Sequence, residues 1–226
     1  MVKGLDTFRK YFEGYENQYV LIDGAACDIV FESNDTSFRA TRDLDMVLIV
    51  EALTSEFGER FWKFIQDGRY RNKATNGEKP QFYRFDKPEN ELFPKMMELF
   101  CRSDFELREM TGVTPIYIDD TVSSLSAILL NDDYYNVLIK GKAVANGLSV
   151  LRPEYLILFK AKAYLDLKQR KQNGETVDSN DIKKHKKDVL RITAELMLES
   201  EPFDDNSLKN YGLRNQEVIE VLKRIF

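Results

Sequence analysis

The stretch Arg39-Ala40-Thr41-Arg42-Asp43-Leu44-Asp45-Met46-Val47-Leu48-Ile49-Val50 decides the fold. Its second half is apolar and rich in β-branched residues, which predicts a buried strand. Side chains alternate across a strand, so one face is expected to carry Arg39, Thr41, Asp43 and Asp45. Two carboxylates at this spacing lie roughly 7 Å apart along the backbone and can converge on one hard cation. Because an acidic pair in an apolar strand is costly without a metal, an arginine or water beside it, we interpret the pair as functional.

The composition is that of a globular protein. The chain has 226 residues, of which 43% are hydrophobic and 31% charged, and its formal net charge is −5. This length suits one large domain or two small ones with an ample core. The acidic balance argues against a protein that coats nucleic acid, although it leaves room for a local basic patch.

Targeting and redox signals are weak in this sequence. No apolar run approaches the length of a membrane-spanning helix, and residues 1–6 lack an apolar signal region. Cys27 and Cys101 are too few for a disulfide framework, and no CxxC motif or Cys/His cluster predicts zinc. The sequence therefore predicts a cytoplasmic protein with no membrane partner.

A glycine turn follows the first expected strand. Residues 19–22 are apolar, Gly24 permits a tight turn, and a helix is expected from about residue 25 to residue 31. A turn of this kind points free backbone N–H groups where a phosphate can bind. The same signal fits a plain turn without a ligand, and the residues alone leave both interpretations open.

Glu98 is a candidate third acid. It is the one acidic residue in the apolar run 94–101, which is expected to form a strand. If this strand pairs beside the acidic strand, a spacing of about 4.8 Å brings Glu98 next to Asp43 and Asp45. Three carboxylates then surround one or two magnesium ions, which activate a hydroxyl and steady a leaving pyrophosphate. The alternative is that Glu98 lies on a solvated sheet face.

The remaining pattern divides the chain near residue 152. Apolar spacings of three and four predict helices over 1–16 and 54–67, with Thr54 or Ser55 as the N-cap and Trp62 in the core. Extended segments are expected at 81–85 and 114–118, a helix at 123–130, and a hairpin between 137–139 and 148–151. From Pro153 the pattern is helical over 153–171, 178–199 and 214–226. We therefore expect an αβ core over 1–152 and a helical region over 153–226 packed on it.

Other catalytic constellations are missing from the sequence. The only histidine, His185, lies among lysines on a helix face expected to be exposed, so we expect neither a ligand nor a general base there. Ser/His and Cys/His nucleophilic schemes are excluded, and there is no P-loop or GxGxxG motif.

A cluster of basic residues lies in the two helices expected after residue 153. We interpret most of these residues as lying on solvated helix faces, with contact to a triphosphate or an RNA backbone as the alternative. The cluster comprises Lys160, Lys162, Lys168, Arg170, Lys171, Lys183, Lys184, Lys186 and Lys187.

The order of these features resembles the nucleotidyltransferase (DNA polymerase β-like) superfamily. The resemblance rests on Ile22-Asp23-Gly24-Ala25, a helix, Arg39-x-Thr41-x-Asp43-Leu44-Asp45-Met46, and an acid on a later strand. More narrowly, the chain is similar to the AbiEii-type nucleotidyltransferases, which are toxins of bacterial toxin–antitoxin systems. Lys160-Ala161-Lys162-Ala163 resembles that family's Lys-x-x-Ala helix, and Asn180-Asp181-Ile182 resembles its Lys-Asp-Ile helix start.

The resemblance implies an α+β fold, with a mixed-sheet core followed by a mainly helical C-terminal part. It implies Asp43 and Asp45 as ligands of Mg²⁺ or Mn²⁺, with Glu98 as the third acid. The reaction implied is transfer of a nucleoside monophosphate from an NTP to a hydroxyl of a tRNA, a protein or a small molecule, and an antitoxin is an implied partner. The expected nucleotide-binding residues are Gly24, Ala25, Arg39, Thr41, Lys160 and Asp181, of which Lys160 contacts phosphate and Asp181 organises the acceptor site.

Three departures from the family pattern keep other functions open. Ala25 lacks the hydroxyl usual after the glycine, Asn180 stands where a lysine is usual, and Glu98 is longer than the common aspartate. One alternative is a nucleotide-binding module that is weak or inactive in catalysis. Another is an interaction protein whose Asp43 and Asp45 pair only with Arg39, Arg84 or Lys160. Lys160 and Asp181 also have interpretations without a role in binding: Lys160 as a surface lysine, and Asp181 as an acid in the first turn of a helix.

Overall fold

A mixed sheet organises the part of the molecule that the structure describes. The computed structural model describes residues 2–39, 41–49, 51–72, 84–100 and 132–197. Its seven strands follow the order β3-β4-β5-β2-β1-β7-β6. Strands β2 and β5, and strands β1 and β7, pair in parallel, whereas the other neighbours are antiparallel. The strands are β1 (Tyr19–Ile22), β2 (Asp43–Leu48), β3 (Arg71–Asn72), β4 (Arg84–Asp86), β5 (Met96–Phe100), β6 (Lys142–Ala145) and β7 (Leu148–Leu151). The predicted α+β class with a mixed sheet is confirmed.

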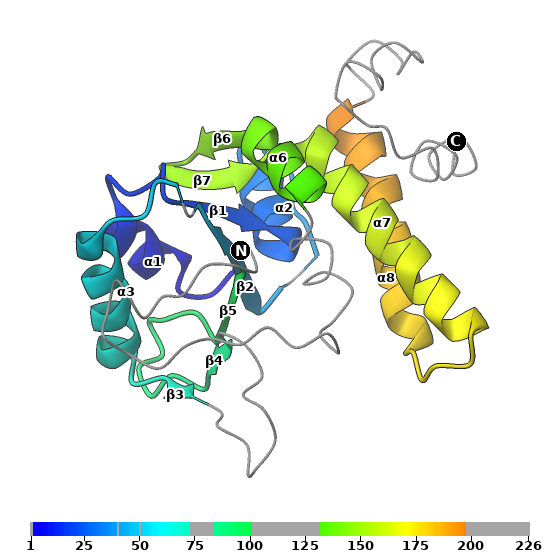
Figure 1. Ribbon diagram of the computed structural model, residues 1–226. Coiled ribbons are helices and arrows are strands. Elements are labelled where there is room, and N and C mark those ends of the chain that lie inside the picture. Colours follow the sequence, from blue (N-terminus) through cyan, green and yellow to red (C-terminus); the bar gives the residue numbers. More distant parts are fainter. Residues whose placement is uncertain (1, 40, 50, 73–83, 101–131, 198–226) are drawn as a thin grey trace.

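Helices cover both faces of this sheet (Figure 1). On one face lie α1 (Leu5–Phe12) and α3 (Ser55–Gly68). On the other, α2 (Asp23–Glu32) packs against β1, β2 and β7, and against α7 (Pro153–Gln172). Helix α8 (Ser179–Ile192) runs back along α7 and continues into a π-helical turn (Thr193–Met197). The α7–α8 pair projects beyond the sheet as a helical arm (Figure 1).

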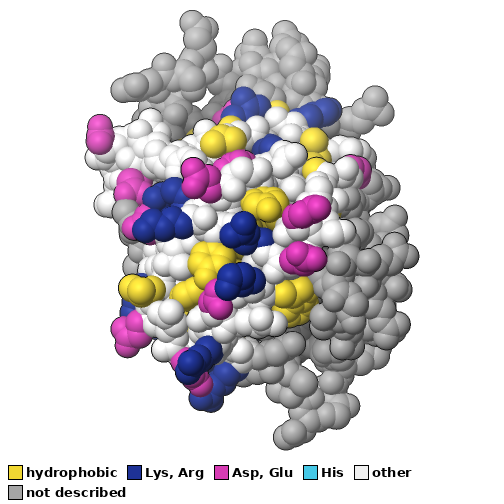
Figure 2. Space-filling view, turned by 90° about the vertical axis from the view of Figure 1, so that its left-hand side faces the viewer, with side chains coloured by type: hydrophobic (Ala, Val, Ile, Leu, Met, Phe, Trp, Pro, Cys, Tyr) yellow, Lys and Arg dark blue, Asp and Glu magenta, His cyan; other side chains and the backbone are white. Residues whose placement is uncertain are grey.

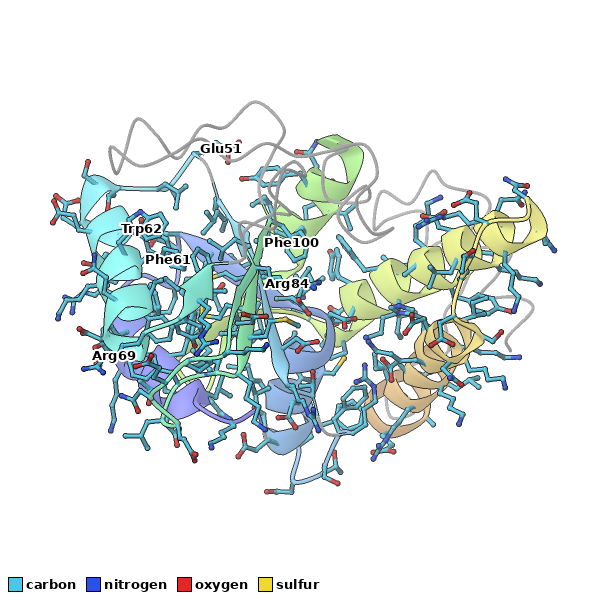
Figure 3. All side chains as sticks on the ribbon, turned by 90° about the horizontal axis from the view of Figure 1, so that it is seen from below. Glu51, Phe61, Trp62, Arg69, Arg84 and Phe100 are labelled. Carbon is cyan, nitrogen blue, oxygen red and sulfur yellow. The ribbon has the colours of Figure 1, made fainter. Side chains whose placement is uncertain are left out.

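Aromatic packing builds the side of the core under α1 and α3. The Phe8 ring meets Tyr19 edge-on at 5.5 Å and Phe64 at 5.8 Å between centroids. On β4, Phe85 contacts Phe61 at 5.6 Å and Trp62 at 5.9 Å. Because side chains alternate along a strand, Arg84 must project from the opposite face of the sheet. Figure 3 shows Arg84 on the side away from Phe61 and Trp62. The outer surface on the side of α1 and α3 carries both acidic and basic side chains (Figure 2).

Several local predictions are confirmed. Helix α3 begins after Thr54, whose side chain accepts a hydrogen bond from the Phe57 backbone N–H at 3.3 Å, as expected for an N-cap. Helix α7 begins at Pro153 and ends at Gln172. Trp62 packs against the core while remaining half-buried. Within the described ranges no helix is long and apolar enough to cross a membrane.

The predicted hairpin is wrong in its first strand. Residues 137–139 belong to α6 (Asp132–Gly141), and the hairpin joins β6 to β7 through Asn146 and Gly147. Both turn residues have positive φ, 50° and 72°, the backbone combination of a tight two-residue hairpin turn. Asn-Gly is the strongest sequence signal for such a turn, and the apolar 137–139 run outweighed it in the prediction.

Some predicted elements lie outside the described residues. These are the extended segment 114–118, the helices 123–130 and 214–226, and the first part of the strand 81–85, of which β4 shows the end. The described part of α8 ends at Ile192 rather than at residue 199. The division at residue 152 falls between β7 and α7, and as a domain boundary it stays a prediction.

Candidate functional site

Three candidate carboxylates share one face of the sheet. Strands β2 and β5 pair in parallel with Asp45 opposite Glu98, and Asp43 lies two residues earlier on β2. The alternating neighbours Leu44 and Met46 are buried on the other face. Asp45 is only 5% exposed, whereas Asp43 and Glu98 are half-buried. The β2–β5 pairing meets the condition under which the sequence interpretation placed Glu98 next to Asp43 and Asp45.

This crowding changes the acidity of the β2 carboxyls. Burial raises the pKa of Asp45 well above its ordinary value, and the carboxylates of Asp23, Glu98 and Asp43 raise it further, together with a hydrogen bond to Glu98. Burial and Glu98 also raise the pKa of Asp43, against an opposing influence of Lys184 and Arg84. Burial and the neighbouring carboxylates both disfavour the charged forms of these acids, and a bound cation would offset that cost.

Arg84 partly meets that need. Its guanidinium donates from Nε to Glu98 Oε1 at 2.5 Å, across the β4–β5 pair where the two residues are opposite each other. The side chains of Arg84 and Glu98 are 45% and 22% exposed, so water weakens the attraction between them. The arginine therefore orients Glu98, while both side chains remain partly accessible to solvent.

The glycine turn lies directly beside the acidic strand. A Cβ atom on Gly24 would lie 2.6 Å from Thr41 Oγ1 and 3.0 Å from Thr41 Cβ, so only glycine fits there. The positive φ of the turn, however, belongs to Asp23 at 49°. Gly24 is therefore required for close approach to Thr41 and not, as predicted, for its own conformational freedom. Ala25 is fully buried inside α2 and presents no side chain to a ligand.

A buried network of charges adjoins the turn. Lys160 of α7 is 1% exposed, and its ammonium donates to Asp23 Oδ1 at 2.5 Å and to Asp188 Oδ2 at 2.8 Å. Asp188 of α8 also accepts two hydrogen bonds from Arg39, at 2.8 Å from Nε and 2.7 Å from Nη2. These partners keep the pKa of both aspartates below the ordinary value despite burial. The network ties the helical arm to the glycine turn and to the segment before β2.

Two expectations about this network need correction. Lys160 is not a surface lysine, because α7 packs it against α2 with its charge neutralised by two carboxylates. Arg39 does not share the strand face of Asp43 and Asp45, because β2 begins only at Asp43 and the guanidinium turns to Asp188. The acids are consequently not paired with Arg39 or Lys160, which the interaction-protein alternative allowed.

Asp188 is a site residue that the sequence interpretation missed. The sequence pointed to Asp181, which is exposed in the first turn of α8. Seven residues later, Lys187-Asp188-Val189 has a lysine, an aspartate and an apolar residue in that order, with the lysine that Asn180 replaces in the first triplet. The buried position of Asp188 distinguishes the two, and the apolar neighbours Val189 and Ile192 were the available signal for it.

The other basic residues differ in exposure, and Lys162, Arg170 and Lys184 are half-buried. Five lysines of the arm are exposed, as the solvated-face interpretation expected: Lys168, Lys171, Lys183, Lys186 and Lys187. His185 was expected on an exposed face, yet burial lowers its pKa to about 4, and its buried Nδ1 has no hydrogen-bond partner among the described residues. Asp23, Lys160, Lys184 and Asp188 all influence its titration, so His185 faces the charge network.

The donor chemistry of this face suits a hard divalent cation. Asp43, Asp45 and Glu98 offer only carboxylate oxygens, the ligands that Mg²⁺ prefers. Among the residues that the structure describes, no three His, Cys, Asp or Glu side chains are arranged to hold a metal ion as a group. A protein cage of three ligands is not needed for Mg²⁺, which usually takes one or two carboxylates and completes its shell with water and substrate phosphates. The residues thus fit a metal shared with a phosphate substrate.

Comparisons with known proteins bear only on the backbone. No protein-family model matches the chain, and no curated protein matches it. Among solved structures, the chain is similar to an antigenic nucleotidyltransferase-like protein from Paracoccidioides brasiliensis. The two share 13% sequence identity, the match covers 97% of this chain and 84% of the other, and the TM-score is 0.48. A likeness of this degree carries no conclusion about activity.

Proposed function

We propose that this protein is a metal-dependent nucleotidyltransferase, which transfers a nucleoside monophosphate from an NTP to an acceptor hydroxyl. One observation carries the proposal: Asp43, Asp45 and Glu98 lie on the same face of the parallel pair β2–β5, with the pKa of both aspartates raised by burial and by the neighbouring carboxylates. Such an arrangement costs stability in a protein that binds no cation. It becomes favourable when a divalent metal and a phosphate chain occupy the face.

The residues take distinct roles in this proposal. Asp43 and Asp45 hold the metal, and Glu98 is placed one strand away to orient and deprotonate the acceptor hydroxyl. Gly24 lets the backbone of the turn come close to Thr41 and to the nucleotide. A bound Mg²⁺ supplies charge stabilisation at the reacting phosphate and the departing pyrophosphate.

The narrower resemblance leads to a narrower proposal. If the chain is an AbiEii-type enzyme, its biological role is that of a toxin in a bacterial toxin–antitoxin pair, with an antitoxin protein as its partner. The acceptor is then a hydroxyl of a tRNA, of a protein or of a small molecule. Transfer of a labelled nucleotide to each class, with a variant lacking Asp43 and Asp45 as the control, separates these acceptors.

A second candidate is a nucleotide-binding protein without transferase activity. It is favoured by the engagement of Glu98 by Arg84, which leaves the third acid less free to act as a base. The absence of a hydroxyl at Ala25 supports the same candidate. This protein would bind nucleotide and metal at the same face and release the nucleotide unchanged.

Thermal melting tests the proposal most directly. The wild type and the double variant Asp43→Asn/Asp45→Asn are melted with each of the four ribonucleoside triphosphates, with and without Mg²⁺. We expect a magnesium-dependent rise in melting temperature with at least one nucleotide, because ligands that bind the folded state stabilise it. The double variant should lose that rise. No rise with any nucleotide in the wild type would contradict both candidates. If a rise is found, transfer of a labelled nucleotide separates an enzyme from a binding protein.

A further inference from the structure

We infer that Lys184 of α8 contacts the phosphates of the bound nucleoside triphosphate, in the place that the family resemblance gives to Lys160. This assignment rests on the proposed function, because it names the residue that recognises the triphosphate at that same site. It also assigns α8 to the binding site, although the sequence interpretation treated most of its lysines as solvated. Three observations support it.

The first observation is that Lys160 is already engaged. Its ammonium is buried and lies within hydrogen-bond distance of two carboxylates, Asp23 and Asp188. To reach a phosphate, Lys160 would have to leave Asp23 and Asp188, two buried carboxylates that it neutralises, which is strongly unfavourable. A phosphate-binding group has to come from elsewhere on this face.

The second observation is the position of Lys184 on α8. It precedes Asp188 by four residues, so the two side chains lie one turn apart on the same helix face. Asp188 points into the network of Lys160 and Arg39, and this fixes the rotation of α8. Lys184 therefore faces the same way as Asp188, one turn nearer the beginning of α8, and is half-buried where neighbouring Lys183 and Lys186 are exposed.

The third observation is the charge around Lys184. Among the cations that lower the pKa of Asp23, Lys184 comes second only to Lys160. Together with the orientation of α8, this indicates that its ammonium lies on the side of the helix towards the glycine turn. Within the described part of the chain it makes neither an ion pair nor a hydrogen bond. A half-buried cation facing the site without a partner is suited to an anionic ligand.

A matched pair of lysine variants tests the inference. Lys184→Gln removes the charge that faces the site, and Lys186→Gln removes the same charge two residues away, about 200° round the helix. Both side chains reach solvent, so both variants are expected to fold. Binding of magnesium tripolyphosphate, an inorganic stand-in for the triphosphate, is measured by calorimetry on the full chain.

We expect Lys184→Gln to raise Kd about tenfold, equivalent to about 1.4 kcal/mol, and Lys186→Gln to change Kd less than about twofold because solvent and salt screen it. Lys184→Arg, which keeps the charge, should restore most of the affinity. Equal effects of the two glutamine variants would overturn the assignment of Lys184 and leave the proposed function standing. A wild type that binds neither tripolyphosphate nor any nucleotide would overturn both.

Discussion

Asp45 illustrates the cost of the acidic face at the scale of one residue. It is buried beside Asp23, Asp43 and Glu98, and its pKa is raised by burial and by all three. Asp45→Asn removes this repulsion, so we expect the metal-free protein to become more stable by about 1–2 kcal/mol, or a few degrees in Tm. The same variant should lose the magnesium-dependent rise in Tm.

Exposed Asp181 supplies the control for this experiment. Asp181→Asn should leave both the Tm and the response to magnesium nearly unchanged. If Asp45→Asn instead lowers the stability and keeps the response to magnesium, Asp45 has a structural role and the metal site lies elsewhere.

His185 gives a prediction about pH. Burial lowers its pKa from 6.5 to about 4. Between these pH values His185 therefore binds a proton in the unfolded chain but not in the folded chain. The stability that His185 contributes is therefore complete above pH 6.5 and declines as the pH falls towards 4, by up to about 3 kcal/mol. The groups facing it are Asp23, Lys160, Lys184 and Asp188.

Urea denaturation of the wild type and of His185→Gln at pH 7, 5.5 and 4.5 measures this effect. The carboxylates titrate in both proteins, so their contribution largely cancels in the difference between the two free energies of unfolding. That difference should move in favour of the variant as the pH falls. A constant difference across the three pH values would show that His185 is protonated as easily in the folded chain as in the unfolded one.

At the scale of elements, the contact between α2 and the segment before β2 depends on Gly24. An added Cβ would lie 2.6 Å from Thr41 Oγ1, so Gly24→Ala forces the turn and the acidic strand apart. We expect a loss of stability of about 1–3 kcal/mol, as for other overpacked positions. Weaker nucleotide binding should accompany it, because the turn and the acids move relative to each other.

A double-mutant cycle identifies the contact responsible. In a Thr41→Ala background the nearest atom is removed, so Gly24→Ala should cost less there than in the wild type, by at least about 0.5 kcal/mol. Chemical denaturation of the four proteins measures the coupling. Additive effects would mean that the strain arises from another neighbour of Gly24.

Patterns within an element were the part of the structure that sequence could predict. Alternation along β2 and the lone acid in β5 gave the faces and the neighbours of Asp43, Asp45 and Glu98, because both depend on the period of a strand. The Thr54 cap and the Pro153 helix start follow from local chemistry in the same way. The first strand of the hairpin was predicted wrongly, because the apolar run 137–139 was given more weight than the Asn146-Gly147 turn.

At the scale of the whole molecule, the charge network joins parts of the chain that are far apart in sequence. Arg39 and Asp188 are separated by 149 positions, and Lys160 and Asp23 by 137. Which lysine is buried, and which aspartate it contacts, depends on how the arm packs on α2. The apolar neighbours of Asp188 indicate that it is buried, but periodicity does not show that its partners are Lys160 and Arg39, so these contacts could not be predicted from sequence.

Lys160→Met tests how strongly the network holds the molecule together. Removal of the ammonium leaves Asp23 and Asp188 buried with fewer partners, so we expect a loss of about 3–5 kcal/mol in the free energy of unfolding. Lys168→Met, on the exposed part of the same helix, should change it by less than about 0.5 kcal/mol. A small effect at Lys160 would show that the two aspartates are neutralised by other groups.

The separation of 149 positions between Arg39 and Asp188 also has a consequence for biosynthesis. The ribosome releases β1, the glycine turn and β2 first, while β7, Lys160 and Asp188 are still to be made. At 5–20 residues per second, this interval lasts roughly 7–30 s. For most of it, β1 lacks its parallel neighbour β7 and Asp23 lacks Lys160, the cation that neutralises it. The site therefore assembles only when translation has passed α8, and a chain truncated before that point cannot form it.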